Sequence, residues 1–229
     1  MLLDPARTRT AASPYLCSGA SHSWLLSFLL MAAVNIAFVS WWSLTSDQIA
    51  GESGPIENFQ LAVLATSLVV FLRTGLGQTN AERHFFIAAA IACLYLFLRE
   101  LDLRTLPVSG WILWLGGDIP RKVIQGLVAT VLVLFVLRNF RAIFDMVRSG
   151  GVRQAWPYAT TFLLFCAAKM AEEISRADKN KFGDFALPHG QLWEEMLELN
   201  AHMMMLAVAV ISYRLGRKLL VPCPAKHSS

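Results

Sequence analysis

From Glu194 to Ile211 the chain reads EEMLELNAHMMMLAVAVI. An acidic beginning passes directly into an apolar run, which indicates a membrane-spanning helix that carries ionisable groups into its own length. At helical spacing Glu195, Glu198 and His202 fall on one face, at positions i, i+3 and i+7. Ionisable groups are costly against lipid, so we predict that this face looks toward other helices or toward water.

The composition of the whole chain favours the same class. Of its 229 residues 55% are hydrophobic and 16% are charged, whereas soluble domains average about 45–50% and about 25%. The net charge of +4 does not indicate a nucleic-acid partner, because the basic residues cluster in short segments between apolar runs. We therefore expect a lipid bilayer, and no nucleic acid, as the surroundings of this chain. The four cysteines show no paired spacing, and those within apolar runs are expected to be small packing residues.

Six runs approach the length of about 20 residues that crosses a bilayer. They cover residues 24–44, 57–74, 84–103, 119–138, 156–176 and 194–215. We predict an all-α integral membrane protein, built as one compact bundle of six transmembrane helices over residues 24–216. Polar tails are expected on either side of this domain, over residues 1–23 and 217–229.

Local signals refine three of the junctions. Pro157 follows the expected start of the fifth run, which suits the first turn of a helix. Residues 105–120 contain Trp111 and Trp114 and predict a shallow interfacial turn. Residues 178–191 are polar, with glycine and proline, and predict a loop.

The basic residues set an orientation. With the N-terminus in the cytoplasm, twelve of the twenty Lys and Arg lie in cytoplasmic segments, and the first outer loop, residues 45–56, has none. We therefore expect both termini in the cytoplasm, in a bacterial inner (plasma) membrane. The acids follow the opposite pattern, since all but Asp4, Glu82 and Asp145 of the sixteen fall in outer loops or the outer ends of spans.

This orientation brings five charged helix ends to one level in the outer part of the bilayer. The second run begins there, the third and fifth end there, and the fourth and sixth begin there. The candidate site consists of the polar residues at these ends, which are Glu57, Gln60, Arg99, Glu100, Lys169, Glu172, Glu173, Glu195, Glu198 and His202. Their convergence is the functional signal, because no single stretch matches a known catalytic signature such as Gly-x-Ser-x-Gly.

Structural explanations compete with a functional one. Acids that begin a helix, such as Glu57, Asp118, Glu194 and Glu195, are stabilised there by the helix dipole. Acids near a helix end need partners, and the i, i+4 spacing offers three ion pairs: Lys169–Glu173, Glu172–Arg176 and Glu100–Arg104. Asn35 is expected to make an interhelical hydrogen bond.

Three functions fit the site. We favour proton- or cation-coupled transport of a small solute, because buried carboxylates and one imidazole suit a proton relay or a hard cation. A divalent cation is compatible but not required, and its ligands would be Glu195, Glu198 and His202. The first alternative is a membrane-embedded enzyme acting on a lipid-linked or periplasmic substrate. The second is a non-catalytic membrane subunit or assembly factor, whose charges pair with one another or with a partner.

Overall fold

The computed structural model describes residues 19–45, 54–78, 80–101, 110, 117–150, 152–176 and 190–219. Almost all of these residues are helical, and no strand occurs among them. They form seven helices, which are α1 (Gly19–Thr45), α2 (Pro55–Gly77), α3 (Asn80–Glu100), α5 (Asp118–Arg138), α6 (Phe140–Gly150), α7 (Val152–Arg176) and α9 (Gly190–Leu219). The predicted all-α class is confirmed.

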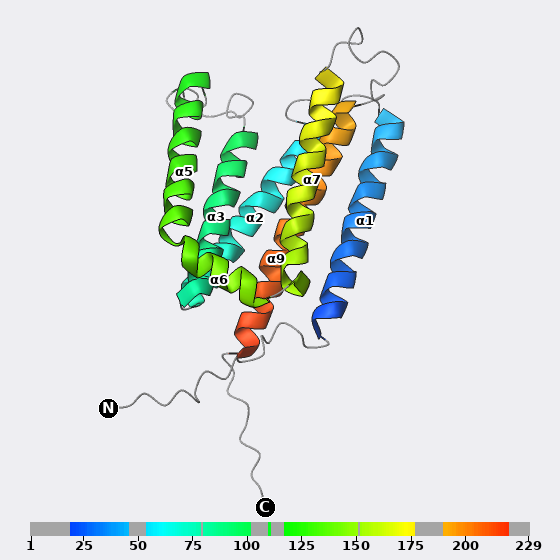
Figure 1. Ribbon diagram of the computed structural model, residues 1–229. Coiled ribbons are helices and arrows are strands. Elements are labelled where there is room, and N and C mark those ends of the chain that lie inside the picture. Colours follow the sequence, from blue (N-terminus) through cyan, green and yellow to red (C-terminus); the bar gives the residue numbers. More distant parts are fainter. Residues whose placement is uncertain are drawn as a thin grey trace, which may run out of the picture.

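Six of these helices match the six predicted runs. They lie side by side and alternate in direction, so that α1 begins and α9 ends at the same end of the bundle (Figure 1). By length and composition four of them, α1, α2, α5 and α9, are able to cross a membrane. We call the end where α3 ends and α9 begins the carboxylate end, and the opposite end the α6 end.

Two local predictions are wrong. Pro157 lies inside α7, because the helix already begins at Val152. At this position proline removes one backbone hydrogen bond, the one to the carbonyl group of Arg153 four residues earlier. Glu194 and Glu195 lie beyond the first turn of α9, because the polar residues from Gly190 onward are already helical. The helix dipole acts mainly within the first turn, so it does not explain these two acids.

Helix α6 lies between the fourth and fifth predicted spans, where no element was predicted, and it has 11 residues. Phe140, Ile143, Phe144 and Val147 recur at the i, i+3, i+4, i+7 spacing of an amphipathic helix. The segment is too short to cross a bilayer, which is why a search for membrane spans passes over it.

Several predictions lie wholly or mostly outside the described residues. These are the two polar tails, the interfacial turn with Trp111 and Trp114, and most of the loop over residues 178–191. At the tail boundaries, α1 begins earlier than expected, at Gly19, and α9 extends beyond residue 216 to Leu219.

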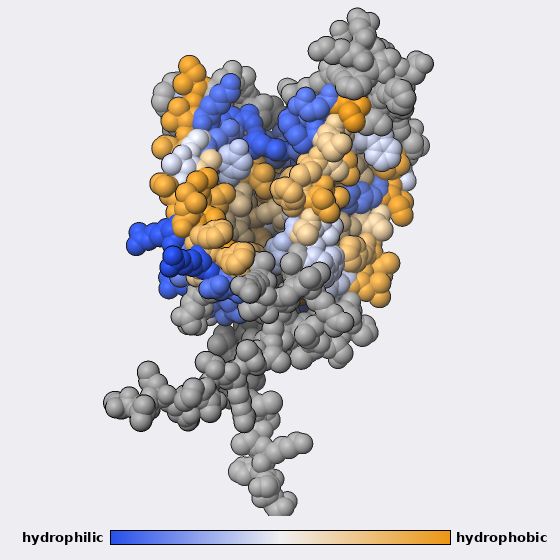
Figure 2. Space-filling model, viewed as in Figure 1, coloured by the Kyte–Doolittle hydropathy of each residue, from blue (hydrophilic) through white to orange (hydrophobic). Residues whose placement is uncertain are grey.

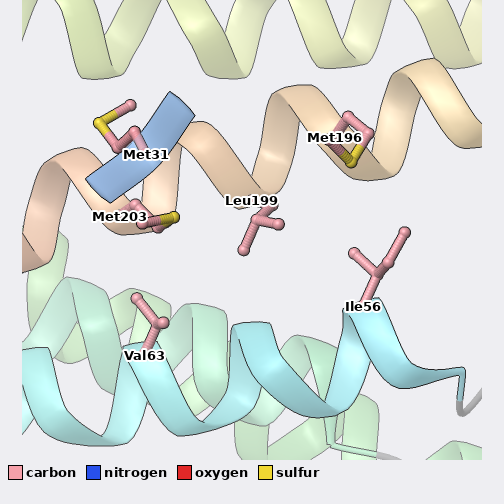
Figure 3. Close-up of a cluster of buried hydrophobic side chains, with 6 residues drawn as sticks. All are labelled: Met31, Ile56, Val63, Met196, Leu199 and Met203. Carbon is pink, nitrogen blue, oxygen red and sulfur yellow. The ribbon is translucent and has the colours of Figure 1, made fainter. Parts of the chain in front are cut away.

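Helices α2 and α9 form the centre of the bundle. One apolar cluster lies between them near the carboxylate end, with Met31 of α1 added from the side (Figure 3). Ile56 and Val63 of α2 point toward Leu199 and Met203 of α9 in this cluster. Burial of one such Ile, Val, Leu or Met side chain contributes about 1.5–3 kcal/mol relative to exposure in water. This value is an upper bound here, because lipid rather than water would otherwise cover a membrane helix. The run Met203-Met204-Met205 is thus a packing element, as Met203 and Met204 are buried.

A second cluster closes the bundle toward the α6 end. It joins Phe71 of α2, Phe86 and Cys93 of α3, and Val208 and Ala209 of α9. Helix α7 packs along α9, whereas α1 and α5 are peripheral. Most of α1 and all of the apolar length of α5 leave their side chains outside the core, which is the pattern of helices that face lipid.

Candidate functional site

The centre of the site is an ion pair between α3 and α9. Arg99 Nη2 lies 2.6 Å from Glu198 Oε1 and 2.5 Å from Glu100 Oε1. The side chain of Glu198 is only 11% exposed, whereas that of Arg99 is 39% exposed. One guanidinium therefore serves two carboxylates, and part of it still faces outward from the carboxylate end. Such charge-assisted bonds are about twice as strong as neutral ones.

A second contact joins α2 to α9 one turn nearer the start of α9. Gln60 Nε2 donates to Glu195 Oε2 at 2.9 Å and to the Glu195 carbonyl oxygen at 3.0 Å. Gln60 is fully buried, and its Oε1 has no hydrogen-bond partner among the described residues. In the part of the chain that the structure describes, no basic side chain forms an ion pair with Glu195. The carboxyl group of Glu195 is thus held by an amide donor of α2 and by no cation among the described residues.

Helix α5 holds the end of α3 in place. Arg121 donates to the carbonyl oxygen of Arg99, and Gln125 Nε2 donates to the carbonyl oxygen of Leu98 at 3.0 Å. The last four carbonyl groups of a helix lack partners within it, so these side chains cap α3 from a neighbouring helix. Sequence reasoning missed Gln125. The available signal was its i, i+4 spacing from Arg121, which places both polar side chains on one face of an apolar helix.

His202 lies one turn deeper than Glu198 on the same face of α9. It is 0% exposed, and neither Nδ1 nor Nε2 has a hydrogen-bond partner among the described residues. The ring of Phe165 in α7 meets it edge to face, with ring centroids 5.3 Å apart. A buried imidazole without partners forgoes hydrogen bonds that each contribute about 0.5–1.5 kcal/mol. Phe165 was not predicted, since its role depends on how α7 packs.

The charged end of α7 forms local pairs. Lys169 pairs with Glu172 and, at 3.7 Å, with Glu173, so the predicted Lys169–Glu173 ion pair is confirmed. The expected pairs of Glu172 with Arg176 and of Glu100 with Arg104 involve side chains outside the described set. Glu57 lies in the first turn of α2, where the dipole explanation remains valid for it.

Asn35 and Asn200 form a reciprocal amide pair between α1 and α9. Asn35 Nδ2 donates to Asn200 Oδ1 at 2.7 Å, and Asn200 Nδ2 donates to Asn35 Oδ1 at 3.0 Å. The predicted interhelical role of Asn35 is thereby confirmed. This pair lies beside the site and attaches a peripheral helix to it.

A hollow lies between α3 with α5 on one side and α7 on the other (Figure 2). Hydrophilic residues line its rim at the carboxylate end, and hydrophobic residues line its interior. At the α6 end the two walls come together, because Phe85 of α3 meets Tyr158 of α7 with ring centroids 4.9 Å apart. Helix α6 also packs against both α3 and α7 there. The hollow is therefore bounded by aromatic side chains toward the α6 end and by hydrophilic side chains toward the carboxylate end.

No protein-family model, curated protein or solved structure matches this chain. The chemistry of the site must accordingly be argued from its own residues. Within the described helices, no group of three or more His, Cys, Asp and Glu is placed to hold a metal ion. Instead, the three side chains on this face of α9 contact different partners. Glu195 contacts Gln60, Glu198 contacts Arg99, and His202 contacts Phe165.

Proposed function

We propose that all six long helices cross the bilayer, with both termini in the cytoplasm and the carboxylate end outside. The lengths of α3 and α7, 21 and 25 residues, correspond to about 30 Å or more of helix, enough to span the hydrocarbon core. Both pack among helices that are apolar enough to cross. The bias of Lys and Arg supports the direction.

We further propose that the protein is a membrane-embedded enzyme acting on an amphipathic, lipid-linked substrate. The observation that carries this proposal is the one-sided hollow, whose polar rim lies at the carboxylate end and whose other end is bounded by Phe85 and Tyr158. A substrate with an apolar chain and a polar head fits such a shape, as its chain enters between α3 and α7 and its head reaches Arg99 and Glu195. Transport would instead require polar access from both sides of the membrane.

The roles of the residues follow from their contacts. Arg99 is the partly exposed cation that orients the head group, while Glu100 and Glu198 hold its guanidinium in position. Glu195 is the general base, because its carboxylate lacks a cation partner among the described residues and is oriented by Gln60. Gln125 and Arg121 act through Arg99 as positioning residues.

Coupled transport of a small solute is the second candidate. The observation in its favour is the pair of acceptors at Gln60 Oε1 and Glu195, which suits a proton or cation. The apolar cluster of Phe71, Phe86 and Val208 lies in its path toward the α6 end. The third role, a non-catalytic subunit, is compatible with the ion pairs but accounts for neither the hollow nor the buried acceptors.

Glu195→Gln tests the enzyme proposal. Cells that express the wild-type chain are compared with cells that express equal amounts of the variant, and their membrane extracts are surveyed by mass spectrometry for amphipathic species. We expect the abundance of at least one such species to differ at least tenfold between wild-type and Glu195→Gln cells. The reason is that a general base contributes about 10²–10⁴-fold to the rate, and this variant removes it. Glu173→Gln, an exposed acid on α7, is the matched control and should behave as the wild type.

Proteoliposomes separate the competing roles. A solute-dependent proton or cation flux that disappears in Glu195→Gln would establish transport and overturn the enzyme proposal. Identical lipid profiles in wild-type and Glu195→Gln cells, with both proteins folded, would support a structural subunit instead.

A further inference from the structure

Helix α6 differs from the long helices in both position and pattern. It lies crosswise between the end of α5 and the start of α7, across the start of α3 (Figure 1). Ala142 and Ile143 are half-buried on the side that packs. A short amphipathic helix at one end of a membrane bundle is suited to the boundary between acyl chains and headgroups.

The outward side of α6 carries an aromatic strip beside a charged strip. Phe140 and Phe144 are 54% and 50% exposed, and their rings stack with centroids 5.8 Å apart. Arg141 and Asp145 follow at the next positions of the helical face and are also exposed. The aromatic strip fits the edge of the acyl region, and the charged strip fits the headgroup layer.

The charge at this corner is positive. Arg138, in the last turn of α5, is exposed like Arg141, and neither guanidinium forms an ion pair within the described ranges. Arg148 adds a further basic residue to the α6 sequence, against one acid, Asp145. Guanidinium groups bind phosphates through paired hydrogen bonds and attract anionic lipid surfaces.

We propose that the corner from Arg138 to Asp145 is a binding site for acidic phospholipid. The phosphodiester and anionic headgroup contact Arg138 and Arg141, and an acyl chain lies against Phe140 and Phe144. The site is independent of the carboxylate end, and it fixes the depth of α6 in the leaflet that the basic residues face.

Native mass spectrometry of the purified full chain tests this site. The protein in detergent is titrated with dioleoylphosphatidylglycerol or with dioleoylphosphatidylcholine. We expect the wild type to retain the acidic lipid preferentially, and Arg138→Gln/Arg141→Gln to weaken that retention roughly tenfold while leaving the zwitterionic lipid unchanged. Arg138→Lys/Arg141→Lys keeps the charge and should retain most of the preference.

Lys122→Gln is the matched control, since it removes one exposed charge at the opposite end of α5. An equal affinity of the wild type for the two lipids would overturn the proposal. Lys122→Gln is compared with the single variant Arg141→Gln, which also removes one charge. An equal loss in these two variants would also overturn the proposal, because the effect would then be one of net charge. Unfolding temperatures of all variants identify any that fail to fold. If the glutamine double variant fails to fold, the lysine double variant, which keeps the charge, decides whether the proposal holds.

Discussion

Arg99 determines the electrostatics of the carboxylate end. Its single positive charge pairs with the carboxyl groups of Glu198 from the neighbouring helix and of Glu100 from its own, and Glu195 adds a third acidic side chain nearby. Removal of one partner from a buried pair leaves an uncompensated charge, and the cost of this exceeds the net stabilisation by the intact pair. Because Arg99 is partly exposed, solvent screens part of that cost.

We predict that Arg99→Met lowers the free energy of unfolding in detergent by about 1–3 kcal/mol. Glu198→Leu alone removes a hydrogen bond to Arg99 and should cost less, since Glu100 still holds the guanidinium. In the double variant the two costs should not add, and intrinsic tryptophan fluorescence during thermal unfolding measures all three. Strict additivity would show that Arg99 and Glu198 are not energetically coupled.

The residues of this network could be found from the sequence, but their pairing could not. The distribution of basic residues and apolar runs along the chain predicted that Arg99, Glu100 and Glu198 lie at the same depth in the bilayer. Arg104 was the expected partner of Glu100, because only contacts within one helix can be read from spacing. Which residue of α3 meets which residue of α9 depends on the rotation of two packed helices about their axes, and this is set by the whole apolar interface.

At the scale of elements, the reciprocal amide pair of Asn35 and Asn200 joins α1 to α9. We predict that Asn35→Leu or Asn200→Leu lowers stability by about 0.6–1.7 kcal/mol, the range for such bonds in membranes. The double leucine variant should lose no more than a single one, because it leaves no unpaired amide. Thr66→Val, which removes an exposed hydroxyl bonded to its own helix, is the control. A larger loss in the double variant would contradict a paired role.

The crossing of α2 and α3 depends on Gly75. A Cβ atom there would lie 3.1 Å from Ile87 Cγ1 and 3.3 Å from the Ile87 backbone nitrogen. We predict that Gly75→Val destabilises by about 1–3 kcal/mol through overpacking. Gly126→Ala, in α5, meets nothing within 4 Å and should be neutral or stabilise by about 0.5–1 kcal/mol. Thermal unfolding of both variants checks this, and equal stability of Gly75→Val and wild type would refute the close approach.

The bounds of elements were predicted unevenly. The six long helices were located by their apolar runs, since desolvation by a membrane is a strong and local signal. The start of α7 before Pro157 and the short helix α6 were missed, because tertiary packing stabilises these segments more than their own composition does. The available signal for α6 was the i, i+4 spacing of Phe140 and Phe144.

For the whole molecule, the central question is how many helices cross the membrane and in which direction. The hollow between α3 and α7 has its hydrophilic rim at the carboxylate end. The sequence could not indicate this hollow, because it depends on which helices do not pack together. The basic residues around α6 favour our proposal that the opposite end lies in the cytoplasm. If α3 and α7 cross as the other long helices do, these two ends lie on opposite sides of the bilayer.

Cysteine labelling of the intact chain tests this arrangement. With the four native cysteines replaced by alanine, we predict that a membrane-impermeant thiol reagent labels Lys122→Cys in intact cells. Arg141→Cys, exposed at the other end of the adjoining helices α5 and α6, should react only after the membrane is permeabilised. Arg73→Cys in α2 should behave as Arg141→Cys, because an even number of crossings separates them if both α3 and α5 span. Labelling of Arg73→Cys and Arg141→Cys from opposite sides would mean that α3 or α5 does not cross. The helix ends that form the polar rim would then not all face the same side of the membrane.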